Sequence, residues 1–347
     1  MDERRPYAEV RERDGPRGDE TGMEGGPQTR EQAGRRPGPG AGQREADGIR
    51  LTGPARLLID RRRLAHTTVL QSFAFDERRG HLYAIQVMEG GVRLPGEPRA
   101  YGHEERRRRG DLCLNRLTTR GDRLGHMFLL GFGHGGAFGL EDGGAGGPAL
   151  WTEWDDNPVS GYGRGICRFH FRHGAVLRAR GSGLATYRPL PGTTKNHPAI
   201  DPATGRLLLR YRRRGRYRYA VYDLRRFAAR DYRPLADLPQ PAAGPPFQGM
   251  ALHGDHVYQL TGSGYGPGNP PSSGGNVRLQ RVDLHTGRVD QQIRVGFGQG
   301  LRPREPEGLA VLRGHGGSSR LCLALTSGPT RGRRYSVYAI GGGGGRG

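Results

Sequence analysis

The sequence predicts an all-β chain folded as a five-bladed β-propeller. Three observations predict this fold. Glycine (62) and proline (25) supply a quarter of the 347 residues, too many for a helical bundle or a coiled coil. Short apolar runs alternate with polar residues, and no segment has a 3.6-residue period. A degenerate motif recurs five times along the chain, with spacings of 63, 62, 52 and 59 residues.

The strand-like runs have turn sequences between them. Clear examples are His81–Val87, Tyr217–Tyr222, His256–Leu260 and Ser319–Leu325. Two of the turns, Asp201–Gly205 and Asp283–Gly287, combine an aspartate with a later glycine. Such turns are stabilised by side-chain hydrogen bonds to the backbone and by glycine at positive φ.

The repeat is a polar residue followed three positions later by alanine and then by an apolar residue. The five polar positions are Gln71, His134, Asn196, Gln248 and Glu307. In a propeller this segment is the first strand of each blade, beside the central channel, where crowding favours small side chains. A β-sandwich or jelly roll is the alternative fold.

The chain divides into three parts on composition. Residues 1–50 contain almost no aliphatic side chains and are expected to be a disordered charged extension. Residues 51–340 form the propeller, and residues 341–347 form a flexible glycine-rich tail. The fifth unit has material for three strands, so we expect its fourth to come from Leu57-Leu58-Ile59 and to close the ring.

No stretch has the roughly 18 apolar residues of a membrane-spanning helix. No apolar run of a signal peptide follows Arg4-Arg5. The sequence therefore leaves the localisation undecided between the cytoplasm and non-classical export.

The charge is strongly basic. The net charge of the chain is +21, and residues 51–347 alone carry +22, from 45 Arg and Lys against 23 Asp and Glu. Lys195 is the one lysine in the sequence. A GC-rich genome explains such an arginine content as compositional bias, whereas a functional explanation is a polyanionic partner bound through guanidinium groups. Both explanations stay open.

If the repeat is real, the five polar residues converge at one mouth of the channel. We expect Gln71, His134, Asn196, Gln248 and Glu307 to form a shallow site for a hydroxyl-rich ligand; alternatively, each caps its own strand. Aromatic and basic residues near the expected loops are candidate peripheral ligand contacts. They are Trp151, Tyr265 and Arg304.

Other motifs predict no cofactor and no metal. The run Gly131–Gly136 matches G-x-G-x-x-G, but no helix pattern follows it, so a tight loop is expected. The three cysteines are far apart and lack ligand spacing. A dyad of His134 or His197 with Glu307 would support acid/base chemistry, so an enzymatic role stays open. The run Arg106–Arg109, in an insert over residues 88–111, is expected to be a solvated loop or else a polyanion anchor.

Several sequence segments resemble a known family. These are Thr68–Asp76, Leu124–Met127, Gly131–His134, Leu150–Glu153, Gly161–Arg164, Phe247–Gly249 and Arg304–Leu309. Over roughly residues 55–340 the chain resembles the β-propeller proteins grouped as phage receptor-binding and teichoic-acid-biosynthesis protein C relatives, often labelled phage baseplate proteins. The resemblance implies a five-bladed propeller associated with wall teichoic acid or a similar glycopolymer. It supplies no catalytic residues.

The combined expectation is a binding module for an anionic cell-wall glycopolymer, such as a polyol-phosphate chain. Neutral hydrogen-bonding side chains would hold hydroxyl groups, and arginines would hold phosphates. One alternative is an enzyme acting on such a polymer, a phosphodiesterase or lyase. Another is a structural component of a tail-like assembly. No recognisable nucleic-acid-binding module occurs, so no specific nucleic acid partner is expected.

Overall fold

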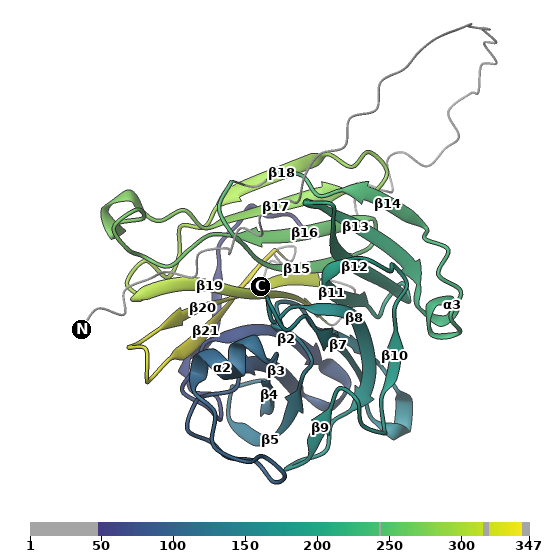
Figure 1. The fold of residues 1–347 in the computed structure, drawn as a ribbon. Helices are drawn as coiled ribbons and strands as arrows, with labels where there is room; N and C mark the ends of the chain where they lie inside the picture. Colours follow the sequence, from purple (N-terminus) through teal and green to yellow (C-terminus); the bar gives the residue numbers. More distant parts are fainter. Residues whose placement is uncertain (1–47, 243, 315–318, 342–347) are drawn as a thin grey trace, which may run out of the picture. The chain divides into compact units, whose positions relative to one another are not determined.

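Five β-sheets stand around a common axis, and each sheet is one blade of a propeller (Figure 1). The computed structural model describes residues 48–242, 244–314 and 319–341, and the unit to which they belong begins at Gly48. The fold class predicted from the sequence is confirmed. Residues 1–47 of the predicted extension 1–50, and the tail from residue 342, lie outside the described residues. Residues 48–50 belong to the folded unit and Ile49 is buried, so the predicted end of the extension is three residues too late.

Each blade is built outward from an inner strand beside the axis. The first blade contains β2 (Leu70–Asp76), β3 (His81–Val87), β4 (Leu112–Thr118), β5 (Arg123–Leu130) and β9 (Val176–Arg178), which pairs parallel with β5. The second contains β6 (Gly139–Glu141), β7 (Ala149–Asp156), β8 (Gly163–His170) and β10 (Ala185–Tyr187). The third contains β11 (Thr194–Asp201), β12 (Arg206–Arg213), β13 (Arg216–Asp223) and β14 (Ala236–Pro239).

The last two blades complete the ring. The fourth contains β15 (Phe247–His253), β16 (His256–Thr261), β17 (Arg278–Asp283) and β18 (Val289–Arg294). The fifth contains β19 (Pro303–Arg313), β20 (Ser319–Ser327), β21 (Arg334–Ile340) and β1 (Arg56–Arg62). The described helices are short: α2 (His103–Arg108), α3 (Leu224–Ala228) and the 3-10 turns Glu77–Arg79, Gly144–Gly146 and Pro271–Ser273. In the described residues, no helix is long and apolar enough to cross a membrane.

The fifth blade is completed by the strand from the other end of the chain. Strand β1 pairs antiparallel with β21, with Leu57 opposite Tyr338 and Ile59 opposite Val337. Ile59 is buried among side chains of the first and fifth blades. The prediction that the segment around Leu57-Leu58-Ile59 closes the ring is therefore confirmed.

Apolar side chains fill the space between neighbouring blades. Between the fourth and fifth blades, Tyr258 and Leu279 pack against Leu323 in one cluster. Ile49 and Leu51, which precede β1, are buried in the same cluster. The backbone N–H of Ile49 also donates to the Tyr258 hydroxyl at 2.7 Å.

The inner strands approach one another so closely that side chains are excluded at one level of the axis. A Cβ on Gly249 would lie 2.9 Å from the backbone of Gly308, and a Cβ on Gly308 would lie 2.9 Å from Cα of Ser72. The Ser72 hydroxyl in turn donates to the carbonyl of Gly135 at 2.7 Å. Small residues are needed here for steric reasons, as the repeat suggested.

The insert between β3 and β4 is anchored by a buried arginine. Arg106, in α2, forms ion pairs with Glu97 and with Asp111, the latter at 2.9 Å, and its side chain is fully buried. For Arg106, the predicted solvated loop is wrong, because two buried carboxylates compensate its charge. Arg108 and Arg109 of the same run are exposed, as expected for a solvated segment.

Truncations from the N-terminus test the closure. We expect removal of residues 1–47 to leave the thermal unfolding transition in place. Removal of residues 1–52 also deletes Ile49 and Leu51 and should lower the free energy of unfolding by about 4 kcal/mol, the value for burying two aliphatic side chains. Removal of residues 1–62 deletes β1 and should abolish the cooperative transition seen by circular dichroism. An unchanged transition in that last variant would contradict closure by β1.

A pair of glycine variants tests the crowding at the axis. Gly308 and Gly205 both have positive φ, 75° and 63°, but only Gly308 has backbone within 3 Å of an added Cβ. Gly205→Ala should lower the free energy of unfolding by about 1 kcal/mol through backbone strain alone. We expect Gly308→Ala to lower it by about 2 kcal/mol more, as measured by denaturant unfolding. Equal losses in the two variants would show that the inner strands can move apart freely.

Candidate functional site

The starts of the inner strands meet at one end of the ring, called here the strand-start mouth. This arrangement follows from contacts between the residues that come directly after the polar repeat positions. Gly249 contacts Gly308, Gly308 contacts Ser72, and Ser72 is bonded to Gly135. Equivalent positions of neighbouring blades therefore lie at one level around the axis, and the polar residue that precedes each of them lies at the same end.

The five polar residues themselves occupy different environments. Gln71, Asn196 and Glu307 are buried, whereas His134 and Gln248 are half-buried. Among the described residues, no hydrogen bond or ion pair joins any two of the five. Two of them bond to nearby backbone: Nδ2 of Asn196 donates to Gly163 at 3.3 Å, and Nε2 of Gln248 donates to Gly262 at 3.0 Å.

A group of cationic and aromatic side chains lies at this mouth, over the second, third and fourth blades. We call it the mouth cluster and define it as Tyr162, Lys195, Arg210, Tyr217 and Phe247. Lys195 Nζ lies 4.4 Å from the ring centre of Tyr162 and donates to the Tyr217 hydroxyl at 2.9 Å. The Arg210 guanidinium lies between the rings of Tyr217 and Phe247, 3.9 and 3.8 Å from their centres.

Arg210 is the most unusual member of the cluster. It is buried, and its guanidinium donates to the neutral side chain of Gln240 at 2.8 Å. Among the described residues it has no carboxylate partner. Burial lowers the pKa of Arg210, because removal from water disfavours the charged form. A buried cation without a counter-ion is unusual and favours the binding of an anion nearby.

The G-x-G-x-x-G run binds a carboxylate of the chain itself. Backbone N–H groups of His134, Gly135 and Gly136 donate to Glu153 at 3.1–3.2 Å, and that of Gly163 donates at 2.7 Å. Burial alone would raise the pKa of Glu153, but His197 and these N–H groups outweigh it and hold the pKa at about 2. The expected tight loop is thus a nest for an internal anion.

Histidines line the same region. Nε2 of His197 lies 3.1 Å from Oε1 of Glu153, and burial lowers the pKa of His197. The His134 ring lies 4.8 Å from that of Tyr162, and burial lowers the pKa of His134 to about 4. The carboxylate beside His197 is therefore Glu153, and the predicted pairing with Glu307 is wrong for His197.

Glu307 is instead close to another carboxyl group. Burial raises its pKa well above the usual range, and the neighbouring Glu305 raises it further. Burial also raises the pKa of Glu305, an effect that Arg333 opposes. Among the described residues, neither carboxyl group has a hydrogen-bond donor, so the protonated form of Glu307 is favoured more than that of an exposed glutamate.

Two of the three predicted peripheral contacts are core residues. Trp151 is fully buried, stacks on Tyr187, and donates from Nε1 to Glu141 at 3.0 Å. Arg304 is also buried, and its guanidinium donates to the carbonyl groups of Val295 and Phe297, both at 2.8 Å. Neither side chain is available to a ligand, because the blades and the loop before β19 cover them.

Tyr265 lies apart from the mouth cluster in a long loop of the fourth blade. It is half-buried, and the guanidinium of the exposed Arg302 lies 4.9 Å from its ring centre. Its predicted exposure is therefore partial, and its role as a ligand contact stays a prediction.

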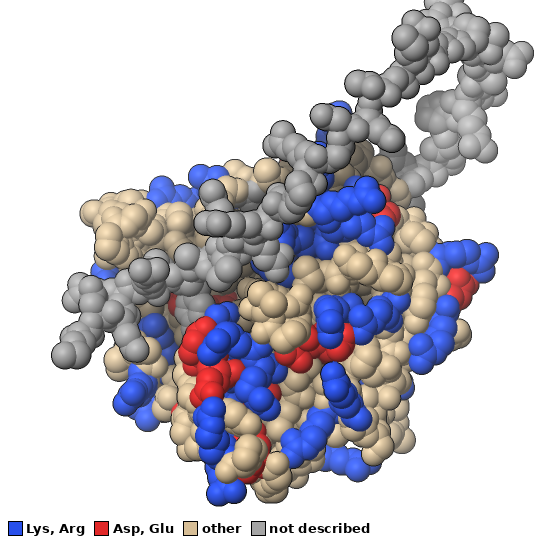
Figure 2. All heavy atoms as spheres, viewed as in Figure 1, with Lys and Arg blue, Asp and Glu red and all other residues tan. Residues whose placement is uncertain are grey.

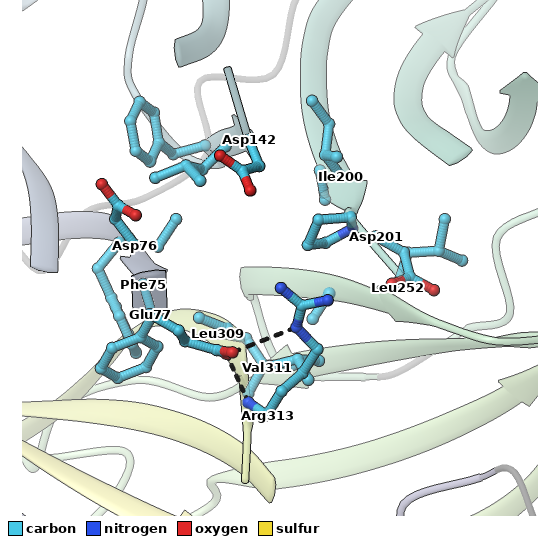
Figure 3. A pocket seen from close by; sticks show the side chains of 18 of the residues that line it. Phe75, Asp76, Glu77, Asp142, Ile200, Asp201, Leu252, Leu309, Val311 and Arg313 are labelled. Carbon is cyan, nitrogen blue, oxygen red and sulfur yellow. Dashed lines mark hydrogen bonds and ion pairs between the residues drawn. The ribbon is translucent and has the colours of Figure 1, made fainter. Parts of the chain in front are cut away.

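The opposite end of the ring has a small cavity of about 60 Å³, room for a few water molecules. Figure 3 shows Asp76, Glu77 and Asp142 on one side of it and Asp201 on the other. Arg313 bonds to Glu77 through its backbone N–H and its guanidinium. The aspartates likewise have partners within the chain, so the strand-start mouth is the better candidate for ligand binding.

Sequence reasoning did not select Lys195, Arg210 or Tyr217 as site residues. Lys195 directly precedes the repeat residue Asn196, and its status as the one lysine was a usable signal. Arg210 and Tyr217 flank the β12–β13 turn and lie outside the repeat, so no periodicity pointed to them. Tyr162 and Phe247 belong to two of the segments that carry the family resemblance, Gly161–Arg164 and Phe247–Gly249.

The Glu153 nest predicts a pH-dependent stability. The pKa of Glu153 is lower in the folded chain than in the unfolded chain. Its ionised carboxylate therefore adds to the free energy of unfolding above pH 5, and this stabilisation is lost as the pH falls toward 2. At pH 7, Glu153→Gln should lower the free energy of unfolding by about 3 kcal/mol, since a buried hydrogen-bonded charge is removed. The difference from the unmodified chain should shrink below pH 4. Glu104→Gln, which breaks an exposed pair with Arg107, is the control and should cost less than 1 kcal/mol at any pH.

Comparisons with known proteins agree with this architecture. A curated relative, "Putative major teichoic acid biosynthesis protein C" of Bacillus subtilis (strain 168), is 25% identical over 288 residues, which are 80% of this chain and 60% of the relative. The chain thus spans less than two thirds of that relative's length. The tail fiber of Staphylococcus aureus phage P68 has a similar fold, with a TM-score of 0.64 and 20% identity over 84% of this chain and 53% of the fiber chain.

The family match covers most of the propeller. Residues 69–339 match the family described as "Phage 5-bladed beta propeller receptor binding platform domain". The matched range begins just before β2 and ends within β21, so it includes the inner strand of every blade. The chain therefore belongs to the family of phage five-bladed β-propeller receptor-binding platform domains.

Proposed function

We propose that the chain binds an anionic cell-surface glycopolymer, such as a polyol-phosphate chain, at the strand-start mouth. The observation that carries the proposal is the buried Arg210 guanidinium, which lacks a carboxylate partner among the described residues and lies beside Lys195. A phosphate group of the polymer would supply the missing negative charge. Lys and Arg bind phosphate through charge-assisted hydrogen bonds, which are stronger than neutral ones.

The aromatic members of the mouth cluster suit the carbon backbone of such a polymer. Tyr162, Tyr217 and Phe247 present ring faces and edges on which a sugar ring or a polyol chain can pack. The same rings hold the two cations in place through cation–π contacts, so the cations are oriented before the ligand arrives. A pre-oriented site loses less conformational entropy on binding.

The polar repeat residues would contact hydroxyl groups of the polymer. Gln71 is the best candidate, because its side chain has no hydrogen bond among the described residues. Gln248 uses only its amide nitrogen on the backbone and keeps its oxygen for a ligand, whereas Asn196 also accepts from the Thr193 hydroxyl at 3.1 Å. His134 borders the mouth cluster through its contact with Tyr162.

The class of partner also agrees with the charge and with the relatives. On the face shown in Figure 2, groups of blue Lys and Arg side chains lie among tan residues and outnumber the red acidic ones. The name of the Bacillus subtilis relative refers to teichoic acid biosynthesis. Membership of a receptor-binding platform family suits attachment to a tail-like assembly, with the polymer as receptor.

Substitution of Lys195 tests the proposal. Lys195→Gln should weaken the binding of a soluble poly(glycerol phosphate) about ten-fold in isothermal titration calorimetry, because a charge-assisted bond contributes about 1.5–3 kcal/mol. Addition of 0.5 M NaCl should displace most of the bound polymer. Arg225→Gln, at an exposed position of α3, removes the same charge far from the mouth and should leave the affinity unchanged. Equal affinity of the two variants would refute the proposal.

A second candidate function rests on the raised pKa of Glu307. A carboxyl group whose pKa is raised by burial is suited to general-acid catalysis, so an enzyme that cleaves the same polymer is the alternative. Turnover of the polymer by the purified chain, lost in Glu307→Gln with binding retained, would favour this alternative. Binding without turnover would favour the binding module.

A further inference from the structure

A second cationic feature lies at the rim of the propeller, away from the mouth cluster. The end of β1 and the turn between β4 and β5 border a hollow of about 650 Å³. Its five basic residues are Arg61, Arg62, Arg63, Arg123 and Arg334. We call this hollow the rim arginine site. It lies between the fifth and first blades, which are neighbours in Figure 1.

The rim arginine site has an excess of positive charge. Its two carboxylates are already paired: Asp60 with Arg61 at 3.2 Å and Asp122 with Arg62 at 3.5 Å. Arg63 and Arg123 have no carboxylate partner among the described residues. Arg334 donates to the backbone carbonyl of Arg61 at 3.3 Å, so its charge is also uncompensated. Three positive charges therefore remain in one hollow.

A β-bulge brings the consecutive arginines together. In a regular strand, neighbouring side chains point to opposite faces, so three successive arginines could not border one hollow. The pairing of β1 with β21 shifts register between Ile59 and Arg62, and Arg61 has a φ of 44°. A bulge redirects side chains in this way. The left-handed backbone is held by the N–H of Arg61, which donates to the Ser336 hydroxyl at 3.0 Å.

The floor of the hollow is closely packed. A Cβ on Gly121, in the β4–β5 turn, would lie 2.8 Å from Cγ of Arg62 and 2.9 Å from Cγ2 of Ile59. The turn thus rests directly on the aliphatic part of Arg62. The arginines border a preformed surface, which lowers the entropic cost of binding a ligand.

We propose that the rim arginine site binds phosphodiester groups of the anionic polymer, at a position separate from the strand-start mouth. Guanidinium groups bind phosphate oxygens in a bidentate manner, and each phosphate needs one or two of them. The identity of the polymer rests on the proposed function, whereas the anion chemistry of this site does not. Among the described residues no aromatic side chain lines the hollow, so they offer no platform on which bases of a single strand could stack. This favours a phosphodiester chain without bases over a single-stranded nucleic acid.

The test compares two double variants of the full chain. Arg63→Gln with Arg123→Gln removes the two arginines that lack carboxylate partners. Arg225→Gln with Arg288→Gln removes the same charge from exposed positions in α3 and in the β17–β18 turn, at the end of the ring opposite the mouth. The probe is soluble poly(glycerol phosphate), titrated by calorimetry between 50 and 200 mM NaCl, which are concentrations that bracket strong and weak screening.

We expect the rim variant to bind about three- to ten-fold more weakly at the lower salt concentration. The slope of log K against log salt should fall by about 1, as for a lost phosphate contact. The control variant should stay within two-fold of the unmodified chain. Equal losses in the two double variants, or no loss in the rim variant, would overturn the proposal. So would a single-stranded DNA of equal charge that binds more tightly than the polymer and loses affinity in the rim variant.

The outcome for Lys195→Gln separates this proposal from the proposed function. If only the rim variant loses affinity, the rim arginine site binds the polymer and the assignment of the mouth fails. If only Lys195→Gln loses affinity, the mouth assignment stands and the rim arginine site fails. Loss in both supports two contacts with one polymer.

Discussion

The close approach of the inner strands at the axis is the constraint on which the rest of the structure depends. A Cβ on Gly249 or on Gly308 would lie 2.9 Å from the backbone of the neighbouring blade. These contacts and the hydrogen bond from Ser72 to Gly135 align equivalent positions of four blades and thereby define which loops share a mouth. They can persist only in a closed ring, and the pairing of β1 with β21 supplies the last strand of that ring.

The candidate site arises where the repeat departs from its own rule. The position after the polar residue is serine or glycine in four blades, but it is His197 in the third. Strand β11 shifts register between Thr194 and His197, as β2, β15 and β19 do at the equivalent position, and Lys195 has a φ of 56° within this shift. A five-fold repeat alone would produce five similar polar positions. The larger side chains of the second, third and fourth blades concentrate charge and aromatic surface on one side of the axis.

The sequence predicted those features that depend on local pattern or on the repeat. The strand His81–Val87, the strand run Ser319–Leu325 and the closing segment around Ile59 are all of this kind. The sequence could not reveal which long side chains are buried, because that depends on neighbouring blades. Trp151 and Arg304 looked available for binding, yet both are covered in the folded chain. Arg210 belongs to the mouth cluster because it lies near the end of β12, and the repeat motif does not include that strand.

The internal anion nest explains why ligand recognition at the mouth must rely on side chains. The backbone N–H groups of the Gly131–Gly136 run are the kind of donors that bind phosphate in other folds. Here they are occupied by Glu153, whose low pKa keeps the carboxylate ionised across the physiological range. A phosphate at the mouth would find no free backbone nest in this loop. In the proposed function its charge is met by Lys195 and Arg210, which the rings of Tyr162, Tyr217 and Phe247 orient.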